Sequence, residues 1–343
     1  MKKALAFLIA FALVGAFVFA QDAAPALKWS GAVYTGFWYD SANDTTQLIR
    51  YYGTPGTRVR LNGSYSNEDM GIAFRLQSND FTAPAFTRAF GWAKLFDGLL
   101  QFNVGKLGDY TFAKGAVWAF GNFDGATGLE TIVSPIAGLK IGTFMPMSIA
   151  GTVPPVNVLK DTAIGVSYSA EGIGDFALVY DLDPRVNAED AAVFSDLMFS
   201  AYISAIENLD VYIEGKVFDL GDDTAGREAF LVSEYFAYAM DALTLELYLD
   251  QDIYADVTAP NTALALTVNP AVSYTIDKYT PKLSLTYALG AAEETWTFNI
   301  NPSVTYALKK GSIELGMNYD MSTTAGVADD STYNVYALCI FNF

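Results

Sequence analysis

TWTFNINPSVTYAL, residues 295–308, alternates between apolar and polar side chains. Trp296, Phe298 and Ile300 begin an apolar series on one parity, and Asn299 and Asn301 belong to an uncharged polar series on the other. A period of two is that of a β-strand, and 14 residues is long for a strand of a soluble protein. A tilted strand crossing a bilayer has one face against lipid and the other against water. The stretch therefore favours a membrane wall around an aqueous lumen, with a strand of a large sandwich as the soluble alternative.

A hairpin unit related to this stretch recurs along the chain. In each copy a Val-Ser-Tyr or Val-Thr-Tyr motif precedes a short turn, and a second tyrosine lies far along the returning strand. The tyrosines of three such units are Tyr168 with Tyr180, Tyr274 with Tyr287, and Tyr306 with Tyr319. Aromatic residues at two levels are expected at the two interfaces of a membrane barrel.

Short turns and long connections alternate between the expected strands. Short turns fall at residues 66–69, 97–98, 135–138, 207–210 and 240–242, and longer, more acidic connections at 40–54, 108–128, 181–190, 220–227, 251–261 and 321–330. Such alternation is typical of the periplasmic and external sides of a barrel. The sequence predicts an all-β fold, a transmembrane antiparallel up-and-down β-barrel of about 18 strands. A barrel of 16 strands is the alternative, because residues 128–134 form a weak strand.

A helical membrane protein is the other reading of a composition that is 52% hydrophobic. The best candidate for a spanning helix, residues 141–159, is uncharged but contains Gly142, Pro146, Gly151, Pro154 and Pro155. Prolines and glycines at these positions would break a membrane helix repeatedly. Without spanning helices, a closed barrel is the remaining way to satisfy every backbone group in lipid.

The N-terminus has the three parts of a secretory signal peptide. Lys2 and Lys3 precede an uncharged run from residue 4 to residue 20, which ends in Val18-Phe19-Ala20. Cleavage is predicted before Gln21, so that residues 1–20 are the signal peptide and residues 21–343 the mature barrel. An uncleaved anchor is the alternative, disfavoured because the run is short and has no flanking stop-transfer charges.

The last strand carries an independent signal. The parity that ends at Phe341 and Phe343 is apolar from Tyr333 onwards, and the chain ends on an aromatic residue. This pattern resembles the C-terminal assembly signal of bacterial outer-membrane barrels, and the whole mature chain is similar to Gram-negative-type porins. The resemblance implies location in the cell outer membrane, contact with its lipid, recognition by the barrel assembly machinery and a homotrimer. Leu338 and Ile340 depart from the pattern, because they place apolar groups on the opposite parity.

The parity opposite the apolar residues predicts which charges line the lumen. Early strands contribute a basic wall, Arg58, Arg60, Arg75 and Arg88, and later strands an acidic arc, Glu214, Glu246, Asp250 and Glu314. Opposed walls of this kind would set a transverse field across a water-filled pore. The alternative is that these charges only solvate the lumen.

The connection at 108–128 is rich in aromatic residues, which are costly to leave in water. It is therefore expected to pack against the protein. In the porins that this chain resembles, the third external loop folds into the barrel and forms the constriction. The resemblance implies that Asp109, Asp124 and Glu130 face the arginines, with Trp118 and Phe120 also in the constriction. The alternative is that the loop covers a subunit interface.

Catalysis and metal binding find no support in the residue types. The chain has no histidine, and its one cysteine, Cys339, lies near the C-terminus, so neither the commonest general base nor a disulfide or thiol site is predicted. No cofactor is predicted. Removing Lys2 and Lys3 leaves 18 Lys and Arg against 38 Asp and Glu, a net charge of −20, which excludes nucleic acid as a partner.

These patterns together predict a porin that forms a passive, water-filled diffusion channel for small hydrophilic solutes. Modest cation preference is expected, because acidic groups outnumber basic ones. A sugar-selective channel is one alternative, favoured if aromatic residues of the third loop form a stacking path. A non-conducting surface adhesin or structural barrel is the other.

Overall fold

The computed structural model describes residues 27–51, 53–107, 127–147, 162–182, 195–220, 228–254, 264–290, 295–323 and 330–343. The strands within these ranges are β1 (Lys28–Asp40), β2 (Thr45–Tyr51), β3 (Thr54–Pro55), β4 (Arg58–Ser66), β5 (Met70–Asn79), β6 (Ala85–Leu95), β7 (Leu100–Lys106), β8 (Thr127–Ile136), β9 (Leu139–Pro146), β10 (Ala163–Ala170), β11 (Gly174–Leu182), β12 (Ser195–Ile203), β13 (Leu209–Leu220), β14 (Glu228–Met240), β15 (Leu243–Tyr254), β16 (Leu264–Tyr274), β17 (Tyr279–Leu289), β18 (Trp296–Leu308), β19 (Gly311–Thr323) and β20 (Asp330–Asn342). Over the same ranges, no helix is both long and apolar enough to cross a membrane.

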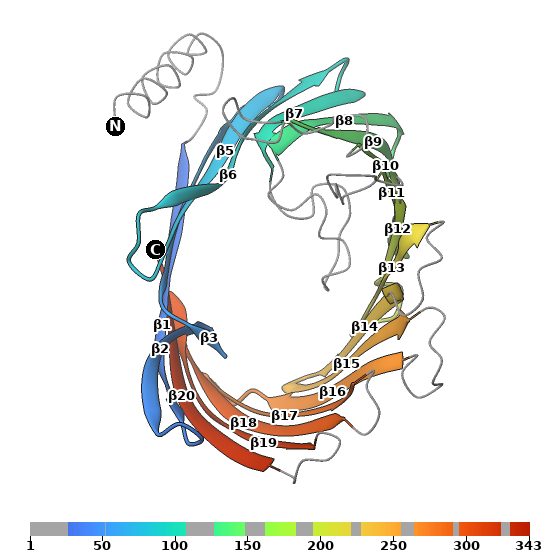
Figure 1. Cartoon of the computed structure of the whole chain (residues 1–343). Coiled ribbons are helices and arrows are strands. Elements are labelled where there is room, and N and C mark those ends of the chain that lie inside the picture. The colour runs from blue at the N-terminus through green and yellow to red at the C-terminus, as the bar shows by residue number, and fades with distance from the viewer. Residues whose placement is uncertain are drawn as a thin grey trace, which may run out of the picture.

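The strands form one closed antiparallel barrel, seen end-on in Figure 1. From β4 onwards each strand pairs with the next along the chain, and β20 pairs with β1 over residues 32–40 and 334–342 to close the ring. Of the 20 strands, β2 and β4 share one wall position and β3 lies off the wall, which leaves 18 wall positions. The predicted all-β up-and-down barrel of 18 strands is confirmed, and the weak segment at 128–134 is part of strand β8.

The second wall position is occupied by two strands in succession. The half of β1 near Asp40 pairs with β2, and the half near Lys28 pairs with β4. Between them the chain leaves the wall, and β3 pairs only with β2, projecting toward the barrel interior in Figure 1. The sequence interpretation of residues 40–54 as one external connection is therefore wrong. Most of that segment is strand, because Thr45, Thr46 and Ile49 are β-branched residues that extend the ladder with β1.

Asp80 fixes the point at which the chain re-enters the wall. Its carboxylate accepts a hydrogen bond from the Thr57 backbone N–H at 2.9 Å and lies 3.6 Å from the Arg50 guanidinium. Gly56 packs directly beside this carboxylate at a φ of +96°, and a Cβ there would approach Asp80 Oδ1 to 1.5 Å. Glycine is required by both the backbone angle and the space.

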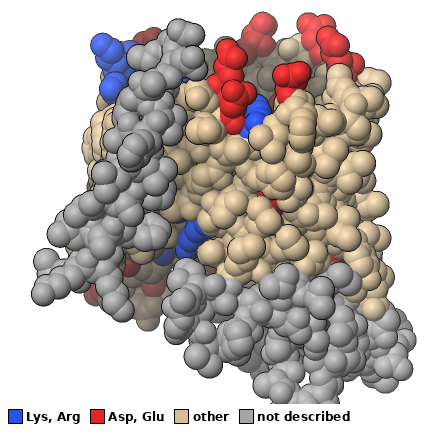
Figure 2. All heavy atoms as spheres, turned by 90° about the horizontal axis from the view of Figure 1, so that it is seen from above, with Lys and Arg blue, Asp and Glu red and all other residues tan. Residues whose placement is uncertain are grey.

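The two faces of the barrel differ in polarity. Large apolar side chains on one parity are exposed, including Trp29, Phe37, Leu245 and Phe341. Polar side chains on the other parity are buried, including Asn103, Asp196, Ser233 and Asn318. These polar side chains lie on the concave side of the wall, where crowding explains their burial. We call this side the inner face. Figure 2 shows a largely uncharged outer surface, with Asp and Glu gathered at one rim.

The closing seam is built around Phe343. Its backbone N–H and C=O both pair with Gly31, each at 3.0 Å. The Phe343 ring lies over Gly31, where an added Cβ would come within 2.1 Å of Cζ. Tyr333, Val335 and Phe341 of the same parity are exposed on the outer face, which confirms the alternation read in the last strand. Of the opposite parity, Leu338 is buried on the inner face.

Two predicted features lie on parts of the chain that the structure does not describe. The signal peptide at 1–20 lies outside the described residues, as do residues 108–126 of the expected third loop. Both stay predictions.

Candidate functional site

The four predicted arginines lie together on the inner face of three neighbouring strands. Arg58 and Arg60 belong to β4, Arg75 to β5 and Arg88 to β6. Arg75 lies directly opposite Arg88 in the register. Parity and strand pairing therefore gather the predicted basic wall into one cluster, the arginine cluster.

Amide side chains orient three of these arginines across the β4–β5 pair. Arg58 Nε donates to Asn79 Oδ1 at 3.1 Å, Arg60 Nε to Gln77 Oε1 at 2.7 Å, and Arg75 Nε to Asn62 Oδ1 at 3.0 Å. Each bond joins residues that are directly opposite in the ladder. Amide oxygens are uncharged acceptors, so these bonds hold the guanidinium groups in place without neutralising them.

Tyrosine rings support the two arginines of β4. Arg58 Cζ lies 4.7 Å from the centroid of Tyr51, to whose hydroxyl it also donates a hydrogen bond, and Arg60 Cζ lies 5.7 Å from the centroid of Tyr34. The two rings meet edge to face at 5.3 Å. These contacts stabilise a cation electrostatically while leaving its charge intact. Tyr51 ends β2, so the split second wall position supplies part of this support, which parity alone does not predict.

The predicted acidic residues also lie on the inner face, but not in one cluster. Glu214 is on β13, Glu246 and Asp250 are on β15, and Glu314 is on β19. In the hydrogen-bonded order β13 is nine strands beyond β4, half of the 18-position circuit. Glu214, Glu246 and Asp250 are therefore across the barrel from the arginine cluster. Glu314 is on its near side, since only β20 and β1 separate β19 from β4.

Lysines compensate part of the acidic arc. Glu246 forms an ion pair with Lys282 of β17 and accepts a hydrogen bond from the Tyr235 hydroxyl at 2.8 Å. Asp196 of β12, buried on the same face, lies 2.8 Å from Lys216 Nζ of β13. Lys282 is a residue of the candidate site that sequence reasoning missed, because it is 36 residues from its partner. These two lysines reduce the negative charge on this side of the inner face.

Hydroxyl groups hold two further residues of the acidic arc. Asp250 accepts a hydrogen bond from Ser233, and Glu314 accepts one from the Tyr336 hydroxyl at 2.8 Å. Glu214 is only 1% exposed. Burial of this extent removes Glu214 from direct contact with solvent, so Glu246, Asp250 and Glu314 are the better candidates for contact with a solute.

Of the five residues predicted in the constriction loop, only Glu130 is described. It lies in strand β8 rather than in a loop, because the ladder between β7 and β8 begins at Thr127. Its side chain is buried and accepts a hydrogen bond from Asn103 of β7. The interpretation of Glu130 as a loop residue is wrong. Asp109, Trp118, Phe120 and Asp124 lie outside the described residues.

An apolar cluster occupies the inner face next to Glu130. Phe144, Ala163, Val179 and Met198 pack together with Leu107 and Ala177, all of them buried. Phe144 lies opposite both Glu130 and Ala163 in the register, and Val179 opposite Met198. The inner face is therefore polar over β4–β6 and β13–β19, whereas over β9–β12 this apolar cluster lies beside buried polar residues such as Asp181 and Asp196.

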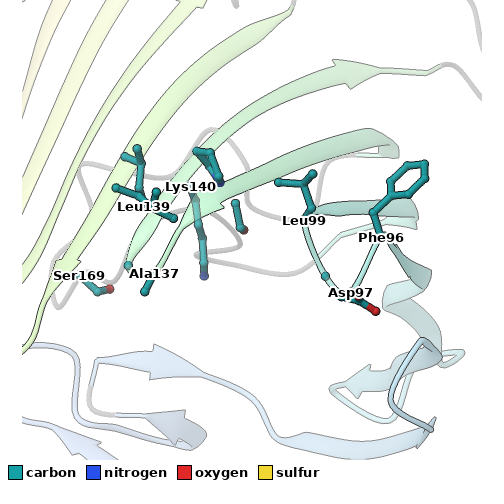
Figure 3. Close-up of a pocket in the computed structure, with 12 residues that line it drawn as sticks. Phe96, Asp97, Leu99, Ala137, Leu139, Lys140 and Ser169 are labelled. Atoms are coloured by element: carbon teal, nitrogen blue, oxygen red, sulfur yellow. The ribbon is translucent and has the colours of Figure 1, made fainter.

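A surface hollow lies among neighbouring turns at one rim (Figure 3). Phe96 and Asp97 of the β6–β7 turn, Ala137 and Lys140 of the β8–β9 hairpin, and Ser169 of β10 line it. The hollow contains none of the residues of the arginine cluster or the acidic arc. Within the described ranges, no group of three or more Cys, Asp or Glu residues could hold a metal ion.

Comparison with known proteins matches the fold but no sequence family. No protein-family model matches the chain, and no curated protein matches it in sequence. Among solved structures, a mutant of the Rh. blastica porin has a TM-score of 0.55 at 14% identity, covering 93% of this chain and 100% of that one. Pseudomonas aeruginosa OpdQ has a TM-score of 0.58 at 10% identity, covering 92% and 98%. Pseudomonas aeruginosa OprD has a TM-score of 0.56 at 12% identity, covering 92% and 95%. At these identities the likeness shows a shared porin-type barrel fold.

Proposed function

We propose that this porin-fold barrel is a passive, water-filled diffusion channel for small hydrophilic solutes in the cell outer membrane. The observation that carries the proposal is the closed wall of 18 strands with an apolar outer face and an inner face bearing Arg, Lys, Asp and Glu. Barrels of 16–18 strands are wide enough to leave an aqueous channel. Charges on the inner face of such a barrel are stable only if water reaches them or a partner compensates them.

The proposed selectivity is a modest preference for cations. Acidic residues outnumber basic ones in the chain, which makes the average potential negative. The arginine cluster opposes this locally, because its amide and tyrosine partners leave the positive charge in place. The lysines paired with Glu246 and Asp196 further limit the preference.

The third external loop, residues 108–128, is proposed to narrow the channel. The apolar cluster of Phe144, Val179 and Met198 supports this proposal, because these inner-face side chains are buried from the water of the lumen, as they would be beneath the aromatic residues of the loop. In that arrangement Asp109 and Asp124 would approach the arginine cluster. Trp118 and Phe120 would supply the apolar contact.

Export and assembly are proposed to follow the route of other outer-membrane barrels. The signal peptide at 1–20 would direct export, and the terminal strand ending in Phe341 and Phe343 would be read by the barrel assembly machinery. The solved structures with this fold named above are porins and other channels rather than enzymes. A homotrimer is proposed from the same resemblance.

Planar bilayer recording tests the proposal. Purified full-length mature barrel should give steady, ohmic steps of current whose reversal potential in a salt gradient shows modest cation preference. A folded barrel, verified by heat-modifiable electrophoretic mobility, that inserts without conducting would contradict the channel and favour the adhesin. A matched variant lacking residues 109–124 should conduct more if the loop narrows the path.

A further inference from the structure

Four tyrosines lie directly opposite one another on consecutive strands. Tyr202 of β12 pairs with Tyr212 of β13, Tyr212 with Tyr235 of β14, and Tyr235 with Tyr248 of β15. All four are on the inner face, since residues two positions away on the same parity include Ser200, Glu214, Ser233 and Asp250. Each is partly exposed. With strands about 4.8 Å apart, the four rings cover about 14 Å of wall.

The rings form a joined aromatic surface with polar tips. Tyr202 and Tyr212 are stacked at a centroid distance of 4.4 Å, and Tyr212 and Tyr235 are tilted at 6.0 Å. The Tyr202 hydroxyl donates to Asp210 and the Tyr235 hydroxyl to Glu246, each at 2.8 Å. A phenol that donates its proton to a carboxylate keeps its oxygen lone pairs as acceptors. The surface therefore combines apolar ring area with hydrogen-bond acceptors.

Amide and hydroxyl groups continue the same line around the wall, on the next strands. Tyr248 lies opposite Asn269, which donates to Thr286. Thr286 lies opposite Asn299, and Asn299 lies opposite Asp320 and donates to it at 2.6 Å. From Tyr202 to Asn299 every member of the line is uncharged. We call this line of residues the neutral row.

The neutral row runs obliquely from one rim toward the other. Tyr202 is one residue from the end of β12, at a short turn, whereas Asn299 is nine residues from the short-turn end of β18. Strands of membrane barrels tilt by about 35–45°, so a line drawn at right angles to them climbs along the pore axis. A solute that follows the row would thus move along the direction of permeation.

We propose that the neutral row is a binding path for carbohydrates, an inference that rests on the proposed channel function. Sugars present apolar C–H patches together with many hydroxyls, and they carry no charge. The tyrosine rings, each with an apolar body and a polar tip, match the C–H patches of a sugar. The amide and hydroxyl groups match its hydroxyls. The row differs from the aromatic third loop, because it belongs to the wall itself.

Maltotriose serves as the probe in two measurements, with a matched control on the opposite face. Tyr212→Ala removes the ring that contacts two others, and Tyr238→Ala removes an exposed tyrosine from the outer face of β14. In bilayers at 1 M KCl, maltotriose should block the parent current saturably, whereas a poly(ethylene glycol) of similar mass should give no saturable block. Tyr212→Ala should weaken the block roughly tenfold, a loss of about 1.4 kcal/mol. Tyr238→Ala should leave it unchanged.

Calorimetric titration of the folded barrel in detergent separates this inference from the channel proposal. Saturable maltotriose binding that Tyr212→Ala weakens and Tyr238→Ala preserves supports the row, whether or not the barrel conducts. Steady conductance without saturable block or binding overturns the row and leaves the channel standing. Equal binding by the parent and Tyr212→Ala also overturns it, and would mean that the tyrosines serve only as cross-strand packing. Heat-modifiable mobility verifies that each variant is folded.

Discussion

Substitution at Gly31 and Phe343 should reveal how the last residue closes the barrel. The Phe343 side chain is 57% exposed, so a little under half of it is buried against the seam. Removing a fully buried Phe costs about 3–5 kcal/mol, and scaling by the buried share gives about 1.3–2.2 kcal/mol for Phe343→Ala. Gly31→Ala should cost about 1–3 kcal/mol, because the new Cβ would lie 2.1 Å from Phe343 Cζ and force the ring aside.

The two costs should not add. With alanine at residue 343 the ring is absent, and only the 2.8 Å approach of the new Cβ to the Arg60 carbonyl oxygen remains. The double variant should therefore be more stable than the sum of the single variants predicts, by about 1 kcal/mol or more.

Urea unfolding of the barrel in lipid vesicles, followed by tryptophan fluorescence, gives the required free energies. Asn342→Ala is the matched control, since its exposed side chain lies on the other parity and should change little. The seam interpretation fails if the single costs add within about 0.5 kcal/mol, or if Asn342→Ala costs as much as Phe343→Ala. In cells, Phe343→Asp should lower the yield of heat-modifiable barrel, because a charge on the lipid face costs more than a missing ring.

Three further outcomes are expected. Replacing the arginine cluster residues Arg58, Arg60 and Arg75 by Gln should strengthen cation selectivity in a salt gradient, and the shift should shrink at 1 M salt, where the Debye length falls from about 10 Å at 0.1 M to about 3 Å. Unchanged reversal potentials would mean that these side chains do not line the conducting path. Lys282→Met should also strengthen cation selectivity, because it leaves Glu246 without its ion pair, and a shift toward anion selectivity would contradict the pairing of Lys282 with Glu246. The free energy of unfolding should change by only about 0–1 kcal/mol, since the pair is partly exposed. Intact mass of mature protein should place its first residue within about two positions of Gln21, and a retained Met1 would refute the predicted export signal.

Sequence periodicity was sufficient for the wall and for which face each residue occupies. Period-two alternation assigned Arg58, Arg60 and Arg75 to one face, and the short turn at 66–69 placed β4 beside β5. Which residues lie directly opposite one another depends on the length and geometry of every turn, because each turn sets the register of its hairpin. Alternation alone therefore could not align Tyr202 with Tyr212 and Tyr235, nor join Lys282 to Glu246.

Local sequence also failed to predict where strands begin and end when contacts with distant residues decide those boundaries. Glu130 was grouped with the third loop through the resemblance to porins, yet pairing with β7 and β9 places it within the ladder. The departure of β3 from the wall depends on Asp80, which is 23 residues from Thr57. No pattern in residues 40–54 indicates that contact.

The order of pairing in the wall constrains how the chain can reach its final form. Almost every strand pairs with its immediate successor, so hairpins can be added one after another at a small loop-closure cost. The pairing of β1 with β20 is different, since it joins residues about as far apart as the chain allows. Until it forms, the growing sheet has two open edges, each a template for another strand. Folding of this chain at high concentration should therefore yield edge-to-edge oligomers, and a short peptide copying β1 should intercept the incomplete sheet by pairing with β20.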